Sequence, residues 1–285
     1  MDLLGSIAPK TRMCSTFSLM TEQPHLLVEQ DGHVLTLTMN RPNARNALSA
    51  EMVVRLTDAW AQINEDPSIR VAILTGAGGH FSSGADLKAM AGGYGDDNEW
   101  TQRSRSDPEM PWKALLRNYR LTKPLIAAVE GYAVAGGTEM LQACDIRVAG
   151  ESAQFGLFEV KRGLFPIGGS TVRLRRQIPY TRAAEILLVG DFIPARDALE
   201  MGLIGRVVAD GEALKAAREI ADKIAANGPL SVQAILRSLR ETEGLTEEQA
   251  LQKELEIGLP VFGTEDAKEG PKAFAEKRTP NFKGK

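Results

Sequence analysis

The sequence predicts an α/β fold that is followed by a region made of helices alone. The first observation is a set of short, wholly apolar runs such as Val71–Gly76, which are typical of strands covered on both faces. The second is that segments with helical periodicity stand between these runs, an order that favours parallel strands joined by crossover helices. The third is a continuous helical pattern from Glu212 onward. A length of 285 residues is enough to bury a sizeable core.

The predicted core elements follow one another in chain order. Val34–Met39 alternates β-branched and apolar residues and therefore predicts a strand, which ends at the polar turn 40–48. Ser49 is a typical helix N-cap, and apolar residues recur after it at helical spacing. Further strands are predicted at Val71–Gly76, Leu125–Gly131 and Asp145–Gly150.

Two segments do not fit this alternation. Residues 89–112 are polar and rich in glycine with little periodicity, and because loops of this length inside a compact domain are usually functional, we expect a lid or a pocket wall. Residues 1–20 lack the sustained apolar core of a signal peptide and predict a disordered N-terminal extension. No window approaches the roughly 20 apolar residues of a membrane span, so none is expected.

The last part of the chain has a helical pattern throughout. A capping box between Thr246 and Gln249 opens one of its helices. Apolar faces such as that of Ile235 and Leu239 need a surface that covers them, and both the protein's own core and a neighbouring subunit remain open as that surface. The predicted helices span residues 212–227, 229–243, 246–259 and 266–278.

Charge and cysteine content argue against several classes of function. Lys and Arg number 34 against 37 for Asp and Glu, and since nucleic-acid-binding proteins are usually basic, we expect no nucleic-acid partner. Cys14 and Cys144 are not in a CxxC spacing, which argues against a disulfide framework or a structural zinc site and suits the cytoplasm. With three histidines in the chain, no metal site is predicted.

The placement of glycine marks a candidate site. Of 27 glycines, 15 lie between Gly76 and Gly169, so this third of the chain needs backbone freedom or close backbone approach. The glycine-bearing turns Gly76–Lys88 and Gly131–Asp145 each follow a predicted buried strand, and ligands of open α/β sheets bind beyond the carboxyl ends of strands. Two amides of such turns aimed at one oxygen would form an oxyanion hole, although each glycine pattern alone is also explained by a tight turn.

Two acidic residues accompany these turns. Glu139 stands in the apolar setting GGTEMLQA near the start of a predicted helix, where a carboxylate needs water or a ligand to face. Glu159 follows twenty residues later, and one strand and a turn would return it to the same end of the sheet. Two carboxylates beside an oxyanion hole can hold one water and exchange protons with it. Each alone is also explained as a capping or salt-bridge residue.

These motifs resemble those of the crotonase superfamily, specifically its enoyl-CoA hydratases, over nearly all of Thr21–Lys285. The resemblance implies a crotonase-like spiral of repeated ββα units in residues 21–208, which would carry the CoA and catalytic site. It also implies a C-terminal helical trimerisation region in residues 209–285 and assembly as a homotrimer or a dimer of trimers. The matching strings are NRPNARNAL, AILTGAGGHFSSGADLK, KPLIAAVEGYAVAGGTEMLQACDIRVAGESAQFG and FAEKRTPNF.

The resemblance further implies a chemistry. It implies that water is added across the 2,3 double bond of a 2-enoyl-CoA, a step of fatty acid β-oxidation, with Glu139 and Glu159 as the catalytic pair. The amides of Ala85 and Gly136 would form the oxyanion hole, and no cofactor is expected because CoA is part of the substrate. The implied CoA contacts are Ala44, Arg45, Ser83, Ala85 and, from a neighbouring subunit, Phe274 and Lys277.

Some positions depart from the family's pattern. AGGTE and GLFEV stand where many members have a third glycine and a proline. Leu157 and Phe158 would make the acyl pocket apolar, and together with the long loop this looks similar to actinobacterial hydratases of lipid or sterol side-chain breakdown. The basic run Arg173, Arg175 and Arg176 is interpreted as a solvated helix face. Isomerase and thioester hydrolase activities of the same superfamily stay open, as does a non-catalytic or RNA-associated homologue.

Overall fold

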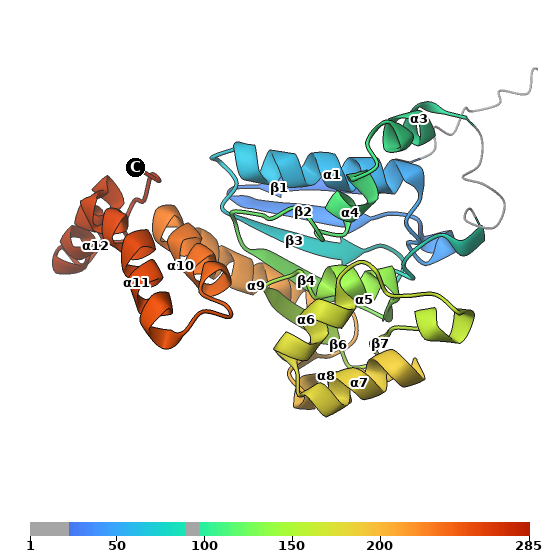
Figure 1. Cartoon of the computed structure of the whole chain (residues 1–285). Helices are drawn as coiled ribbons and strands as arrows, with labels where there is room; N and C mark the ends of the chain where they lie inside the picture. The colour runs from blue at the N-terminus through green and yellow to red at the C-terminus, as the bar shows by residue number, and fades with distance from the viewer. Residues whose placement is uncertain (1–22, 89–96) are drawn as a thin grey trace, which may run out of the picture.

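A six-stranded sheet forms the centre of the computed structural model, which describes residues 23–88 and 97–285 (Figure 1). The strand order is β1-β2-β3-β4-β6-β9, in which β1 and β2 are antiparallel and all other pairs are parallel. The predicted parallel α/β core is thereby confirmed. The strands span β1 Leu26–Asp31, β2 Val34–Met39, β3 Val71–Gly76, β4 Leu125–Val129, β6 Ile146–Gly150 and β9 Arg206–Val208.

Apolar cover on both faces explains why β3 and β4 are almost wholly apolar; the one buried hydroxyl in them, that of Thr75, donates to the carbonyl of Ala128 at 2.9 Å. All residues of β4 are buried, and so are all residues of β3 except its last, Gly76, which is partly exposed. Because successive residues of a strand point to opposite faces, Val71 and Ile73 pack in one hydrophobic cluster, whereas Ala72 and Leu74 pack in another. A polar residue on either face of these strands would therefore be buried without water.

The helices α1 (Ala50–Glu65) and α9 (Ala213–Ala225) cover the two faces of this sheet. Ser49 caps α1 as predicted, since its side chain accepts a hydrogen bond from the N–H of Met52 at 3.2 Å. Alanines form the buried face of α9 and let this helix lie close to the strands. The helical C-terminal part of the chain therefore begins with a helix that belongs to the layers of the core.

A second, three-stranded sheet has the order β5-β7-β8, with β5 and β7 parallel and β7 and β8 antiparallel. Its strands contain three, three and two residues, which is too short for a two-residue periodicity to be visible in the sequence. This sheet was therefore not predicted. Its strands span β5 Tyr132–Val134, β7 Gln154–Gly156 and β8 Ile193–Pro194.

Two helices, α3 and α4, occupy part of the segment 89–112, so the expectation of a loop there is wrong. Asn98 opens α3 with a capping box. Arg103 of α3 donates to both carboxylate oxygens of Asp58 on α1 at 2.7 and 2.5 Å, and the guanidinium of Arg55 on α1 lies 4.7 Å from the ring centre of Trp100, so this polar helix contacts α1 through charged and aromatic side chains. Residues 89–96 of the expected lid lie outside the described residues. The helices span Glu99–Ser106 and Met110–Ala114.

Short helices surround the second sheet and join it to the first (Figure 1). Several of them carry residues of the candidate site. They span η1 Pro42–Ala44, α5 Gly136–Leu141, η2 Glu159–Arg162, α6 Ser170–Gln177, α7 Tyr180–Val189 and α8 Ala195–Glu200.

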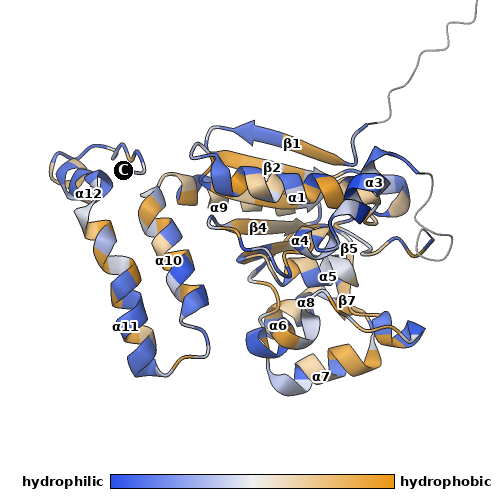
Figure 2. Ribbon diagram, turned by 45° about the horizontal axis from the view of Figure 1, so that its top comes forward, coloured by the Kyte–Doolittle hydropathy of each residue, from blue (hydrophilic) through white to orange (hydrophobic). Residues whose placement is uncertain are grey.

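The helices α10, α11 and α12 extend away from the two sheets, as Figures 1 and 2 show from two directions. The predicted capping box of Thr246 and Gln249 is present at the start of α11. On α10, Ile235 and Leu239 remain 61% and 70% exposed, so the core of the same chain does not cover them. Within the described residues, no helix has the length and apolar character needed to cross a membrane. The elements span α10 Pro229–Glu241, α11 Glu247–Gly258, η3 Leu259–Gly263 and α12 Glu265–Ala275.

Candidate active site

The turn after β3 is built around the buried side chain of Asn46. Its Nδ2 donates to the carbonyls of Ala77 and His80 at 2.9 and 2.6 Å, and its Oδ1 accepts from the N–H of Arg41 at 2.8 Å. Asn46 has a φ of 55°, a left-handed conformation that asparagine adopts more readily than most residues. This side chain therefore fixes the first glycine turn at the carboxyl end of β3.

The first glycine turn is hydrogen-bonded to β5, which opens the second turn. The N–H of Ser82 donates to the carbonyl of Tyr132, and the N–H of Val134 donates to the carbonyl of Ser82, each at 2.9 Å. The Ser82 hydroxyl in turn accepts from the N–H of Gly84 at 3.1 Å. The two glycine turns predicted from the sequence are thus held side by side.

The amides of Ala85 and Gly136 lie close together where the turns touch. Gly84 has a φ of 80°, and a Cβ atom on it would stand 2.6 Å from the nitrogen of Gly136. A Cβ on Gly136 would lie 3.6 Å from the nitrogen of Ala85. Within the described part of the chain, neither N–H donates to a protein acceptor. Two unpaired donors in this arrangement have the composition of an oxyanion hole.

The backbone turns sharply just before the second of these amides. Ala135 has a φ of 50° and a ψ of −125°, a strained conformation for a residue with a Cβ atom. Its N–H donates to the carbonyl of Gly156 at 2.8 Å, which ties the strained residue to β7. The strain therefore sets the direction in which α5 starts.

Glu139 lies one turn into α5 and is only 5% exposed. Its Oε1 accepts a hydrogen bond from the N–H of Ser170 at 3.3 Å. Burial raises the pKa of Glu139 to about 7; the Ser170 hydrogen bond opposes this rise, and the charge of Glu159 adds to it. A carboxyl group with such a pKa exchanges protons readily near neutral pH.

Glu159 reaches the same region as the first residue of η2. Two strands in different sheets, β6 and β7, separate it from α5, where the sequence analysis expected one strand and a turn. Its Oε2 is buried and has no hydrogen-bond partner among residues 23–88 and 97–285. Burial raises the pKa of Glu159, while its own N–H and the charge of Arg162 act in the opposite direction. Its charge also acts on Glu139, so the fold brings the two predicted carboxyl groups near enough to interact electrostatically.

The residues predicted to contact CoA divide into two groups. Ala44, Arg45 and Ser83 lie together, because Ser83 donates its N–H to the Arg45 carbonyl at 2.9 Å and its hydroxyl to the Ala44 carbonyl at 3.3 Å. Phe274 and Lys277, at the end of α12, are not brought to them within one chain, since α12 lies away from α5 in both Figures 1 and 2. The Phe274 side chain is fully outside the core, at 87% exposure.

A row of aromatic side chains starts at the first group. The guanidinium of Arg45 lies 5.2 Å from the ring centre of Tyr132, which stacks on His80 at 5.0 Å. Tyr132 also contacts Phe192 at 5.6 Å, and Phe192 packs edge to face on Phe158 at 4.8 Å. The row therefore connects the turn that carries Arg45 with the residue that precedes Glu159.

Sequence reasoning missed the segment that contacts Glu139 from α6. Ser170 donates to the carboxylate, and a Cβ on Gly168 would stand 2.4 Å from Oε2. Arg173, one turn further along, has a buried Nη1 atom, so its interpretation as part of a solvated helix face is wrong. Arg175 and Arg176 are exposed, as that interpretation requires. The sequence signal that could have identified this segment is the pair Gly168 and Gly169 directly before the start of α6, because adjacent glycines indicate close backbone approach.

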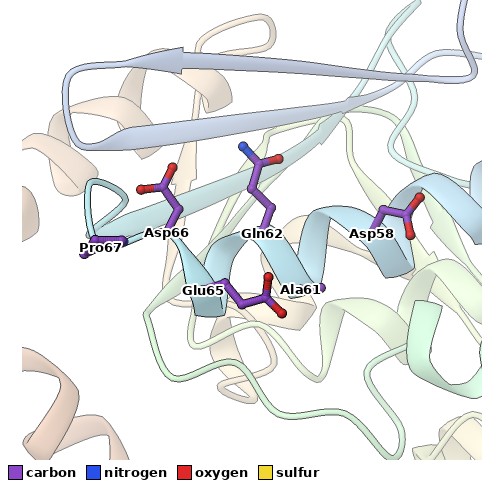
Figure 3. Close-up of a pocket in the computed structure, with 6 residues that line it drawn as sticks. All are labelled: Asp58, Ala61, Gln62, Glu65, Asp66 and Pro67. Carbon is purple, nitrogen blue, oxygen red and sulfur yellow. The ribbon is translucent and has the colours of Figure 1, made fainter.

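A separate hollow lies on the C-terminal half of α1, beside the chain that enters β3 (Figure 3). The glycine turns stand at the other, carboxyl end of β3. Asp58, one of its acidic residues, is already paired with Arg103. Over the described residues, no group of three or more His, Cys, Asp or Glu is placed to hold a metal ion. The hollow is lined by Asp58, Ala61, Gln62, Glu65, Asp66 and Pro67.

The sequence profile of the family described as enoyl-CoA hydratase/isomerase matches residues 29–285. This chain belongs to the enoyl-CoA hydratase/isomerase family. Enoyl-CoA hydratase EchA19 of Mycobacterium tuberculosis is 57% identical over 272 residues, which cover 92% of this chain and 97% of the relative. The 2,3-dehydroadipyl-CoA hydratase of Escherichia coli is 37% identical over 260 residues, which cover 91% of this chain and 99% of the relative.

Solved structures of the enoyl-CoA hydratase/isomerase family have the same fold. Enoyl-CoA hydratase EchA1 from Mycobacterium marinum superposes with a TM-score of 0.83 at 42% identity, and enoyl-CoA hydratase from Bacillus anthracis with 0.84 at 39% identity. Each match covers 92% of this chain and 100% of the solved chain. The expected crotonase fold, with its C-terminal helical region, is thereby confirmed.

Proposed function

We propose that this family member is a 2-enoyl-CoA hydratase, a hydro-lyase that adds water across the 2,3 double bond to give a 3-hydroxyacyl-CoA. One observation carries the proposal: the unpaired amide of Gly136, close to that of Ala85, opens the short helix α5 that carries the buried carboxyl group of Glu139, on which the charge of Glu159 acts. Hydration needs both parts, since charge develops on the thioester oxygen while protons move at the double bond.

The two amides would bind the thioester carbonyl oxygen. When the water oxygen bonds to C3, negative charge passes through C2 to this oxygen and gives an enolate. The N–H groups of Ala85 and Gly136 already stand side by side before the reaction, so they stabilise this charge without reorganisation. Loss of one such donor typically raises the barrier by about 3 to 4 kcal/mol.

The two glutamates would carry out the proton transfers. One carboxylate takes a proton from the water molecule while the water oxygen bonds to C3. The other carboxyl group gives a proton to C2. Raised pKa values of Glu139 and Glu159 support this scheme, because a pair that holds one proton near neutral pH contains an acid and a base at once. Either assignment of the two roles gives the same product.

CoA binding would use parts of two chains. Ala44, Arg45 and Ser83 form the local turn, and Phe274 and Lys277 would reach it from a neighbouring copy in a homotrimer or a dimer of trimers. The exposure of Phe274, and its distance from the turn within one chain, support this arrangement. We expect no separate cofactor, because CoA is part of the substrate.

The proposal also covers the compartment, the pathway and the substrate class. We propose that it acts in the cytoplasm, in the breakdown of fatty acids by β-oxidation, and on substrates of lipid or sterol side-chain degradation. Cys144 is a free, buried thiol, which suits a reducing compartment. The apolar Phe158 beside Glu159 supports a hydrophobic acyl group.

The test is the loss of the 2-enoyl thioester absorbance near neutral pH, over a panel from four-carbon to sterol-sized enoyl-CoA substrates. We expect turnover by the wild type and none by Glu139→Gln or Glu159→Gln. Product analysis separates the other family activities, because hydration alone gives 3-hydroxyacyl-CoA, whereas an isomerase moves the double bond and a hydrolase releases CoA. Unchanged turnover in both variants, or salt-dependent RNA binding without affinity for CoA, would overturn the proposal.

A further inference from the structure

The helix α6 carries three arginines, and Arg173 differs from the other two because part of its guanidinium is buried. Arg175 and Arg176 are exposed to solvent. The Nη1 atom of Arg173 is buried and has no hydrogen-bond partner within the described residues, and Arg173 donates through Nη2 to the carbonyl of Leu116. A buried cation without a close anion is unfavourable unless another charge compensates it. A compensating negative charge is therefore expected among the neighbours of Arg173.

The guanidinium of Arg173 and the carboxylate of Glu139 lie against two consecutive glycines. A Cβ on Gly168 would stand 2.4 Å from Oε2 of Glu139, and a Cβ on Gly169 would stand 3.3 Å from Nη1 of Arg173. The next residue, Ser170, donates its N–H to Oε1 of Glu139. The charge of Glu139 acts on Arg173 and favours its ionised form.

Among the charged groups around Arg173, Glu139 is the first that compensates its positive charge. Glu159 faces Glu139 from η2 and opposes its ionisation. Arg117 and Arg120 act on Arg173 from the segment after α4, and the Cys144 thiol acts on it from the segment between α5 and β6. Burial lowers the pKa of Arg173, and the nearby Glu139 is the first of the charges that act against this.

Backbone contacts hold the guanidinium in this place. Leu116, whose carbonyl accepts from Arg173, has a φ of 53°, a left-handed conformation unusual for a buried leucine. In return, Nε of Arg117 donates to the carbonyl of Ile167 at 2.8 Å. The two arginines thus join the segment after α4 to the segment before α6 in both directions. Gly168, which contacts Glu139, lies between Ile167 and Arg173 and is therefore held by the same pair of hydrogen bonds.

We propose that Arg173 is a positioning residue for the hydration reaction, whose buried positive charge allows the Glu139–Glu159 pair to release a proton at neutral pH. The inference rests on the proposed function for the reaction, but the electrostatic coupling can be measured without it. Arg173 contacts no reacting atom and acts through the carboxylate of Glu139. The charge itself carries this role, so a lysine at the position should retain part of it.

The test compares Arg173→Met, Arg173→Lys and the exposed control Arg175→Met. We expect Arg173→Met to move the limb of the kcat/KM pH profile that reports Glu139 upward by about one pH unit, because removal of a nearby cation raises a carboxyl pKa. Arg173→Lys should move it by less, and Arg175→Met should reproduce the wild type. A lower rate with an unmoved profile in Arg173→Met would overturn the inference.

A second readout needs no activity. Titration of the Glu139 carboxyl carbon by ¹³C NMR should show the same upward shift in Arg173→Met, and this remains measurable if the wild type does not hydrate enoyl-CoA. Failure of the proposed function would then appear as no turnover with a shifted titration. Failure of the inference would appear as an unshifted titration. If Arg173→Met does not fold, an unshifted Glu139 titration in the uncharged, polar variant Arg173→Gln overturns it.

Discussion

The carboxylate of Glu139 packs directly on Gly168, where a Cβ atom would stand 2.4 Å from Oε2 and 2.7 Å from Cδ. The backbone of Gly168 is outside the left-handed region, so an alanine is compatible with its conformation. The obstacle is the end of a side chain, which can move. The requirement for glycine at this position is therefore set by the place of the carboxylate and not by the turn.

Gly168→Ala is expected to displace the Glu139 carboxylate while the fold is retained. We expect kcat/KM to fall about 100-fold, because a shift of about 1 Å in a catalytic group has this effect. Thermal unfolding should change little. Gly205→Ala is the matched control, since the nearest atom to its Cβ is 3.8 Å away. Wild-type activity of Gly168→Ala would contradict the assigned contact.

Gly84→Ala and Gly79→Ala separate backbone strain from damage to the oxyanion hole. The two glycines have φ values of 80° and 75°, so each alanine should lower the free energy of unfolding by about 1 to 2 kcal/mol. Only the Cβ on Gly84 meets the Gly136 nitrogen, whereas nothing lies within 4 Å of a Cβ on Gly79. Gly84→Ala should therefore lower kcat by a further factor of about 100 to 1000. Equal kcat values for the two variants would argue against the oxyanion hole.

Glu139→Gln is expected to stabilise the protein in alkaline but not in acidic solution. Burial raises the pKa of Glu139 from its ordinary value of 4.5 to about 7, so between these values the folded state binds a proton that the unfolded state lacks. Wild-type stability therefore falls as the pH rises through this interval. The stability advantage of the variant, measured by urea unfolding, should be about 2 kcal/mol larger near pH 8 than near pH 5. An equal advantage at both values would show that the carboxyl group is not desolvated.

Arg45→Ala tests the proposed CoA turn. The Arg45 side chain is exposed above Tyr132 and would contact the anionic CoA, so its loss should raise KM about 3- to 10-fold with kcat nearly unchanged. The effect should shrink at high salt. Arg196→Ala, which removes an exposed arginine paired with Glu200, serves as the control. A fall in kcat with constant KM would place Arg45 outside the CoA site.

Ile235→Glu combined with Leu239→Glu tests the proposed assembly. Both side chains are more than half exposed in one chain, and charges at these positions would be buried in an interface between copies. Light scattering should show the molar mass of a trimer or hexamer for the wild type and a lower mass for the variant. Arg237→Ala on the same helix should leave the mass unchanged. A monomeric wild type at micromolar concentration would contradict the shared CoA site.

Elements with full apolar cover were predictable from the sequence, and those that depend on distant partners were not. The run Val71–Gly76 became β3 with the same bounds, because burial on both faces requires an unbroken apolar run. Leu26–Asp31 was missed because this edge strand buries only Leu26 fully and shows no alternation. The polar helix α3 was missed for a similar reason, since Arg103 holds it through Asp58, which is 45 residues away.

The candidate site was predictable where local sequence determines it. The glycine turns and Glu139 are recognisable in the sequence, because positive φ angles favour glycine and a carboxyl group is unusual in an apolar helix. Arg173 gave no such signal. Its spacing from Arg175 and Arg176 resembles a solvated face, and its burial depends on the Leu116 carbonyl, which only the folded chain brings near.

The position of α9 on the sheet also bears on how the chain is made. One face of β3, β4 and β6 is covered by a helix that begins more than a hundred residues after β3 ends. At synthesis rates of about 5 to 20 residues per second, that face of the nascent chain stays bare for roughly 10 s. The ribosome-bound intermediate therefore displays a strip of valine, isoleucine and alanine, and its folding is completed only late in translation.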